Sequence, residues 1–173
     1  MIILILHYLI LYSLKLFAQE INISIIDTIK KQKMLIWLCN REAFEDSAFK
    51  FWFDESYNNY QLDYKTIDKL DNKLDSISIT IVMGTWCSDS KEQIPAFYKI
   101  LDELNCDSNS ITLINVDRNK KGLSNEIKKL NIELIPTIIF YKQRKKIGRI
   151  IETPYESLEK DLINITNNWY ETF

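Results

Sequence analysis

The sequence predicts an α/β protein in which helices flank a central mixed β-sheet. Short runs rich in β-branched residues alternate with amphipathic segments of helical period, as strands and helices do in α/β proteins. The last two apolar runs are separated only by a charged turn, which predicts an antiparallel hairpin, and one more amphipathic segment follows them. A chain of 173 residues is expected to form one compact domain.

The apolar start of the chain predicts export. Residues 1–17 are almost wholly apolar, and the composition turns polar after Ala18. This pattern is typical of a signal peptide, so we expect residues 1–18 to be removed and the protein to be periplasmic or extracellular. No Lys or Arg precedes the apolar run, and the alternative is therefore an uncleaved N-terminal membrane anchor.

Residues 19–76 are expected to form an N-terminal extension, largely helical, that packs on the core. Residues 21–33 predict a strand and a short helix, and residues 34–38 predict a second strand. A helix over 43–60 and another over 64–74 should follow. The first of these helices carries its aromatic residues at spacings that place them on one face: Phe44, Phe49, Trp52, Phe53, Tyr57 and Tyr60.

Residues 77–173 are expected to form the core. The β-branched run 77–83 predicts a buried strand. A helix should run from Ser88 to about Asn105, with Pro95 kinking it about two turns in. The remaining elements are predicted in order as strand 111–116, helix 123–130, strand 137–141, a turn at 144–146, strand 147–151, and a final amphipathic helix opened by Thr153-Pro154, with Leu158, Leu162, Ile165 and Trp169 toward the sheet.

Three separated features in this framework carry a resemblance. The strand 77–83 leads into Trp86-Cys87, where a helix begins, Pro95 lies eight residues after that cysteine, and Ile135-Pro136-Thr137 precedes a later strand. Together they make the chain resemble the thioredoxin superfamily over roughly residues 77–168. The resemblance implies a thioredoxin-like fold, a cis bond before Pro136 facing the thiol, and thiol–disulfide exchange.

The first four residues of the corner read Cys87-Ser88-Asp89-Ser90. A cysteine at a helix N-terminus is a typical nucleophile, because unpaired backbone N–H groups and the helix dipole favour its thiolate. Ser90 stands where the family carries its resolving cysteine; its hydroxyl could donate to the thiolate, whereas the charge of Asp89 opposes it. The catalytic candidates are therefore Cys87, Ser90 and Asp89, and the substrate-binding candidates are Trp86, Ser88, Ile135, Pro136 and Thr137.

Other parts of the family's proton-transfer apparatus are also replaced. Ile81 occupies the place of a buried acidic residue, and Leu113 that of its lysine partner. Cys106 lies past the far end of the helix that starts at Cys87, roughly 25 to 30 Å away, which excludes it as a resolving thiol. Cys39 remains open as a resolving cysteine, although a buried structural role is the commoner case.

Composition excludes several other functions. The net charge is −2, and no Lys/Arg stripe alternates with aromatics, so we expect no nucleic-acid partner. The three cysteines are widely spaced, and the only histidine, His7, lies in the apolar start, so we expect neither a metal nor another cofactor.

Two functional hypotheses remain. The first is an exported protein in which Cys87 performs monothiol exchange, isomerase- or reductase-like, with thiols or disulfides of proteins or small molecules. The second is a redox-inactive module that binds an extended peptide between Trp86 and Pro136. A role in cluster assembly, by analogy with monothiol glutaredoxins, ranks last because the chain lacks recognisable glutathione-binding residues.

Overall fold

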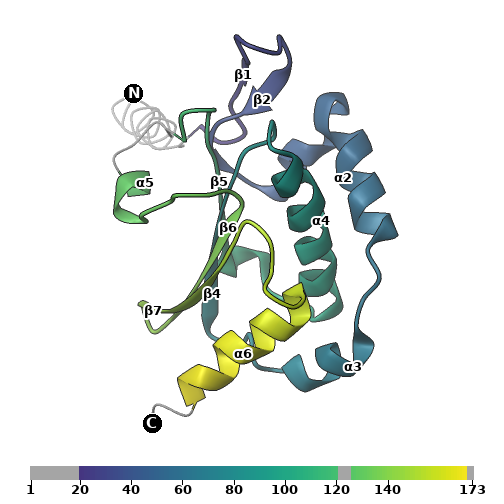
Figure 1. Cartoon of the computed structure of the whole chain (residues 1–173), viewed down its shortest axis with the longest axis vertical. Helices are drawn as coiled ribbons and strands as arrows, with labels where there is room; N and C mark the ends of the chain where they lie inside the picture. The colour runs from purple at the N-terminus through teal and green to yellow at the C-terminus, as the bar shows by residue number, and fades with distance from the viewer. Residues whose placement is uncertain (1–19, 121–125, 171–173) are drawn as a thin grey trace, which may run out of the picture.

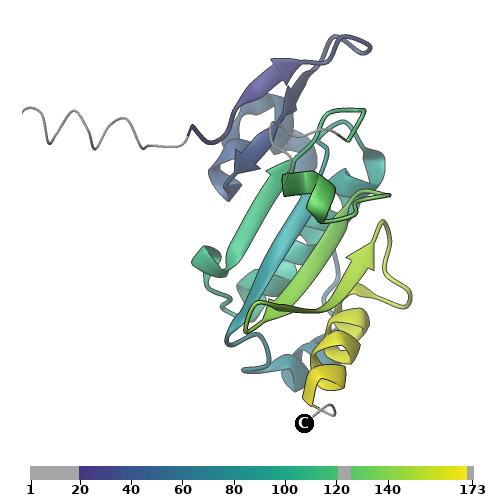
Figure 2. The same cartoon turned by 90° about the vertical axis from the view of Figure 1, so that its left-hand side faces the viewer.

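A mixed five-stranded sheet forms the centre of the computed structural model, which describes residues 20–120 and 126–170. The strands lie in the order β3 (Trp37–Cys39), β5 (Ile111–Asn115), β4 (Ile77–Met83), β6 (Thr137–Lys142) and β7 (Lys145–Ile151). Only β4 and β5 pair in parallel, with α4 connecting them; the other neighbours are antiparallel. The predicted α/β fold with a mixed sheet is confirmed, and Figure 2 shows the strands of the sheet side by side.

Helices cover both faces of the sheet (Figure 1). On one face lie α4 (Ser88–Glu103) and α6 (Leu158–Tyr170), with α2 (Ser47–Asn59) packed on the outside of α4. The short α5 (Glu126–Lys129) lies on the opposite face. Within the described ranges, no helix is long and apolar enough to cross a membrane. The expected signal peptide lies outside the described residues.

Two apolar clusters fill the two sides of the sheet. The larger one lies between the sheet and α2, α4 and α6, and its fully buried side chains include Phe49, Phe97 and Phe140. Residues on both sides of position 76 share this cluster, since it contains Leu35 and Phe53 as well as Leu162. The smaller cluster, on the α5 face, consists of Val82, Ile114, Val116, Ile127 and Ile135.

The aromatic segment forms two helices rather than one. A 3-10 helix, η1 (Arg41–Glu45), is separated from α2 by Asp46, whose extended backbone caps α2 and whose carboxylate accepts from Ala48 N at 2.9 Å. The aromatic face is confirmed: Phe44 and Phe53 stack with centroids 4.6 Å apart, and Phe53 contacts Tyr98 of α4 at 6.0 Å.

The prediction of a strand and helix over 21–33 is partly wrong. The chain forms a hairpin of β1 (Ser24–Ile26) and β2 (Lys33–Leu35), and the residues between them make a turn in which Asp27 accepts from Ile29 N at 2.9 Å. The strand expected over 34–38 is divided, because Trp37 has a φ of 73° and redirects the chain from β2 into β3.

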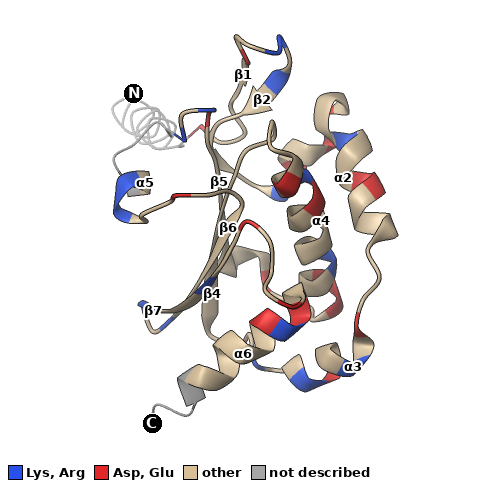
Figure 3. Cartoon of the chain, in the orientation of Figure 1, with Lys and Arg blue, Asp and Glu red and all other residues tan. Residues whose placement is uncertain are grey.

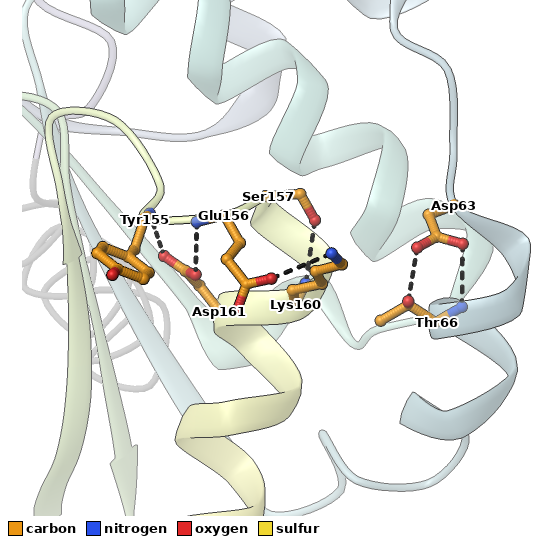
Figure 4. A network of polar contacts seen from close by, with 7 residues as sticks. All are labelled: Asp63, Thr66, Tyr155, Glu156, Ser157, Lys160 and Asp161. Atoms are coloured by element: carbon orange, nitrogen blue, oxygen red, sulfur yellow. Dashed lines mark hydrogen bonds and ion pairs between the residues drawn. The ribbon is translucent and has the colours of Figure 1, made fainter.

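The second predicted helix, over 64–74, is shorter than expected. It consists of α3 (Tyr64–Ile67), followed at once by the 3-10 helix η2 (Asp68–Leu70). Asp63 caps α3, because its carboxylate accepts from Thr66 Oγ1 at 2.6 Å and from Thr66 N at 3.3 Å (Figure 4). The backbone of Asp71 then leaves the helical region, with φ −49° and ψ 128°, which ends the helix before Leu74.

The C-terminal helix begins later than predicted, at Leu158 rather than at Thr153-Pro154. Ser157 Oγ accepts from Lys160 N at 3.2 Å, as a helix cap does. Asp161 accepts from Tyr155 N at 2.7 Å and from Glu156 N at 3.3 Å, so it holds the preceding loop in a non-helical course (Figure 4). The side chain of Trp169 lies outside the described residues.

The remaining strands and helices follow the sequence closely. Strand β4 matches its predicted bounds, and α4 runs through Pro95 without interruption. The β6–β7 turn is formed by Gln143 and Arg144, both at positive φ, so β7 starts two residues before the predicted strand. Figure 3 shows basic residues gathered around this turn. The start of the predicted helix 123–130 lies outside the described residues, and α5 covers part of the rest.

Candidate functional site

Cys87 lies in the turn between the end of β4 and the start of α4. Its backbone N–H donates to Gly84 O at 2.9 Å, and its carbonyl accepts from Lys91 N at 3.2 Å. Cys87 is thus the N-cap residue of α4, and its side chain is partly exposed. The predicted strand-to-helix corner with a cysteine at the helix N-terminus is confirmed. A thiol placed there is reachable by a substrate and lies at the positive end of a long helix.

The sulfur of Cys87 lies against the loop that carries Pro136. Its thiol donates to Ile135 O at 3.5 Å, and the Ile135-Pro136 bond is cis, as the resemblance implies. The Asp89 carboxylate oxygen lies 3.9 Å from the same sulfur. The sequence therefore identifies correctly the two segments that meet at the thiol.

The other predicted site residues have different surroundings. Ser90 is fully buried, and its hydroxyl accepts from Gly84 N at 3.3 Å, so it fixes the backbone that follows β4. Thr137 is buried and donates to Leu134 O at 2.6 Å. Ser88 is exposed on the first turn of α4. The hydroxyl of Ser90 thus serves the backbone of the corner, where sequence reasoning expected it to serve the thiolate.

Trp86 is held beside the thiol by two contacts. Its indole N–H donates to Val116 O at 2.9 Å, and the Arg118 guanidinium lies 5.0 Å from its ring centroid. A side chain at Gly84 would place its Cβ 2.6 Å from Trp86 Nε1 and 3.0 Å from Ile135 Cδ1. Only glycine therefore allows the indole and the Pro136 loop to approach the corner this closely.

The N-terminal hairpin is bound to the same corner, which sequence reasoning missed. Arg118 pairs with Asp27 of the hairpin turn through two nitrogens, Nε and Nη2, each 2.7 Å from Asp27 Oδ2. Leu35 N donates to Thr85 Oγ1 at 3.1 Å, next to Trp86. Asp27 is 3% exposed. In the sequence Asp27 is one more charged residue, and neither its burial nor its partner is visible there.

The Asp27–Arg118 pair makes stability depend on pH. The hydrogen bond from Arg118 lowers the pKa of Asp27 below its ordinary value. A lowered folded-state pKa gives stability that is complete above the unfolded-state pKa of about 4 and is lost as pH falls through the folded-state pKa. We therefore expect Asp27→Asn to lower the free energy of unfolding at about pH 7, and the difference from wild type to shrink toward about pH 3. Urea denaturation at both pH values measures it.

A surface ion pair supplies the control. Asp54 pairs with Lys50 one turn away on α2 at 3.2 Å, and both side chains are nearly half exposed. Asp54→Asn should change the free energy of unfolding by less than about 1 kcal/mol. A difference between Asp27→Asn and wild type that stays the same from neutral to acidic pH would mean that the charge of Asp27 has no part in stability.

The two other cysteines lie away from Cys87. Cys39 lies in β3 opposite Leu113, which pairs with Ile81, six residues before Cys87. Cys39 belongs to the larger cluster, whereas Cys87 packs on the smaller one. Burial raises the pKa of Cys39 to about 11. Cys106 follows the far end of α4, and burial raises its pKa too. All three thiols are free, and this arrangement gives Cys39 no part in resolving a bond at Cys87.

The predicted replacement of the proton-transfer pair is visible in the sheet. Ile81 and Leu113 are direct partners in the β4–β5 register, and both are buried. The two positions are therefore adjacent, as the resemblance implies, and carry only apolar side chains. Neither side chain can take up or deliver a proton.

Comparison with known proteins gives one family match. A family model described as thioredoxin matches residues 50–162, which is more than half of the chain. No curated protein is similar enough in sequence to count as a match.

Among solved structures, a protein of unknown function from Pseudomonas aeruginosa is similar with a TM-score of 0.51 and 13% identity, over 72% of this chain and 85% of that one. Thioredoxin O2 from Arabidopsis thaliana has a TM-score of 0.38 and 22% identity, over 62% of this chain and 85% of its own. Mitochondrial thioredoxin 3 from Saccharomyces cerevisiae has a TM-score of 0.38 and 22% identity, over 63% and 98%. At these identities the structural likeness concerns the fold alone.

Proposed function

Since the chain belongs to the thioredoxin family, we propose that it exchanges thiols and disulfides with Cys87 as its single active-site nucleophile. The observation that carries the proposal is the placement of this sulfur. It is partly exposed at the N-cap of α4 and lies 3.5 Å from the carbonyl of Ile135, beside Pro136. Family membership supports thiol–disulfide chemistry in general, and the residues around Cys87 support the monothiol form of it.

The proposed reaction has two exchange steps. The Cys87 thiolate attacks a substrate disulfide, a bond forms between the two sulfurs, and the second substrate sulfur leaves as a thiolate that takes up a proton from solvent. An external thiol then attacks the mixed disulfide, forms a new disulfide with the bound group and regenerates Cys87. An external thiol is required because Ser90 has no sulfur and Cys39 is buried in the larger cluster, on which Cys87 does not pack.

We also propose that the protein acts outside the cytoplasm. The apolar residues 1–17 and the polar sequence after Ala18 support a cleaved signal peptide. An N-terminal membrane anchor is the alternative, and the molecular mass of the protein purified from its host distinguishes the two.

Alkylation of the three cysteines at a series of pH values tests the proposed nucleophile. At about pH 8 only about one Cys39 thiol in a thousand is ionised, because its pKa is about 11. Burial also raises the pKa of Cys106. We therefore expect iodoacetamide to modify Cys87 first, at pH values where Cys39 and Cys106 stay largely unmodified. Mass spectrometry of the peptides measures each site.

Two controls belong to this experiment. In the denatured protein the three cysteines should be alkylated at similar rates. In Cys87→Ser the fast alkylation should be absent, while Cys39 and Cys106 react as slowly as in wild type. A folded protein in which Cys87 stays unmodified up to about pH 9 would contradict the exchange function. The remaining reading would then be a redox-inactive module that binds peptides beside Pro136.

A further inference from the structure

A cleft of about 300 Å³ opens next to the corner, between the β1–β2 hairpin, α2 and the first turns of α4. Trp86 forms part of its wall, so the cleft borders the residue that precedes the nucleophile. Met34, Phe49 and Trp52 supply apolar surface. Its volume lies at the lower end of the range for small-molecule sites, which suits a group the size of one or two side chains.

The charges that line the cleft do not balance. Asp27 is paired with Arg118, and Lys33 is paired with Asp46 at 2.5 Å. Lys91 also lines the cleft, and it makes no ion pair with any of the residues that the structure describes. Its ammonium nitrogen lies 5.6 Å from the centroid of the Trp52 ring. The cleft therefore presents one uncompensated cation above an aromatic surface, which is complementary to an anionic group.

Lys91 is also close to the nucleophile along α4. It lies one helical turn after Cys87, and its N–H donates to the Cys87 carbonyl at 3.2 Å. Cys87 is the N-cap residue of α4, so its Cα lies about one helical turn, roughly 5–6 Å, from the Cα of Lys91. A group joined to the Cys87 sulfur can thus place a carboxylate near Lys91 through a linker of only a few atoms.

We propose that this cleft binds a carboxylate of the substrate, so that the protein prefers thiols and disulfides with an acidic group a few bonds from the reacting sulfur. The proposal rests on the exchange function of Cys87. Lys91 is the group that contacts the carboxylate, and the apolar wall contacts the linker. The same chemistry has two sources, a small acidic thiol or an acidic side chain next to a protein's cysteine.

A matched pair of disulfides tests the small-thiol source. In the reaction with 3,3′-dithiodipropionic acid, Cys87 keeps one propionate half and releases the other as its thiolate; the diamide reacts in the same way without the charges. We expect Lys91→Gln to slow modification by the diacid about three- to tenfold, because the variant loses the charged hydrogen bond between the Lys91 ammonium and a carboxylate of the reagent. The ratio of the diacid rate to the diamide rate isolates this contact, because an effect of Lys91 on the Cys87 thiolate itself acts on both reagents.

Lys50→Gln is the matched control for net charge. Lys50 lies on α2 outside the cleft and pairs with Glu45 and Asp54. This variant should leave the ratio of diacid to diamide rates as in wild type.

Two peptides with a disulfide-bonded cysteine, flanked by Glu in one and by Gln in the other, test whether the carboxylate can come from a protein side chain. A preference for the diacid or for the Glu peptide that is lost in Lys91→Gln supports carboxylate binding in the cleft. No such preference with both pairs, or an equal effect of Lys50→Gln, overturns it.

A measurement without sulfur chemistry separates this proposal from the exchange function. Suberate has the length of the diacid, with two methylene groups in place of the disulfide. Its binding to the full protein can be followed by tryptophan fluorescence, because Trp52 and Trp86 line the cleft. We expect its dissociation constant to rise about three- to tenfold in Lys91→Gln. Equal affinity of wild type and Lys91→Gln for suberate would overturn the proposed carboxylate binding, even if Cys87 reacts with disulfides. If suberate binding depends on Lys91 but Cys87 of the wild type does not react with the diamide, only the exchange function is overturned.

Discussion

Ser90→Cys is expected to release its own mixed disulfides at least about 10³ times faster than the wild-type protein does without added thiol. Position 90 lies three residues after Cys87, on the first turn of α4, and the Ser90 hydroxyl already points back at the corner, 3.3 Å from Gly84 N. A thiol held at this position attacks the bond at Cys87 within the molecule, and well-oriented intramolecular groups reach effective concentrations far above those of free thiols.

The lifetime of a mixed disulfide at Cys87, followed by mass spectrometry after excess reagent is removed, measures this effect. Ser88→Cys is the matched control: it adds the same thiol one residue from Cys87, at an exposed position. Adjacent cysteines rarely reach disulfide geometry, so this variant should keep the long lifetime of wild type. A Ser90→Cys protein whose mixed disulfide persists as long as that of Ser88→Cys would show that position 90 does not face the sulfur.

Phe49→Ala is expected to lower the free energy of unfolding of the whole chain by about 3–5 kcal/mol. Phe49 is 1% exposed in α2, and it belongs to the same apolar cluster as Phe97 of α4 and Phe140 of β6. Removing its ring leaves a cavity in a core that residues before and after position 76 build together. The loss should therefore appear in one transition that includes the sheet, not in a separate unfolding of the N-terminal part.

Phe51→Ala supplies the control on the same helix. Phe51 is two residues further along α2 and is 77% exposed, so its replacement should change stability by no more than about 0.5 kcal/mol. Equilibrium denaturation followed by both tryptophan fluorescence and far-UV circular dichroism gives the two values. Two separate transitions in Phe49→Ala would mean that residues 19–76 form a unit of their own.

The sequence predicts best the elements whose burial is continuous or periodic. Strand β4 could be bounded to the residue because Ile77–Met83 lies in the middle of the sheet between two strands, is rich in β-branched residues and buries Ile77, Ile79, Ile81 and Met83 on one face. The corner at Cys87 and its meeting with Pro136 could be predicted because short motifs carry them. The start of α6 could not be predicted, because the Asp161 carboxylate fixes the preceding loop by accepting from backbone N–H groups. Such bonds leave no periodic pattern in the sequence.

The N-terminal hairpin and the cleft could not be predicted for a different reason. Both depend on pairs between positions far apart in the chain, Asp27 with Arg118 and Leu35 with Thr85. Isolated charged or polar residues of this kind read as surface positions in a single sequence. Lys91 likewise looks like one more charge on an amphipathic helix, and only the position of Trp52 beside it shows that it lines a cleft.

The order of the strands also determines when the protein can fold during its synthesis. Strand β3 is made early, yet its one partner among the described strands of the sheet is β5, and β4 obtains its second neighbour only when β6 has been made. Such distant pairings form late and slowly. The nascent chain therefore lacks a closed sheet until most of it has left the ribosome. The export proposed above requires a chain that is still unfolded when it crosses the membrane, and this order of pairing leaves the chain unfolded for most of its synthesis.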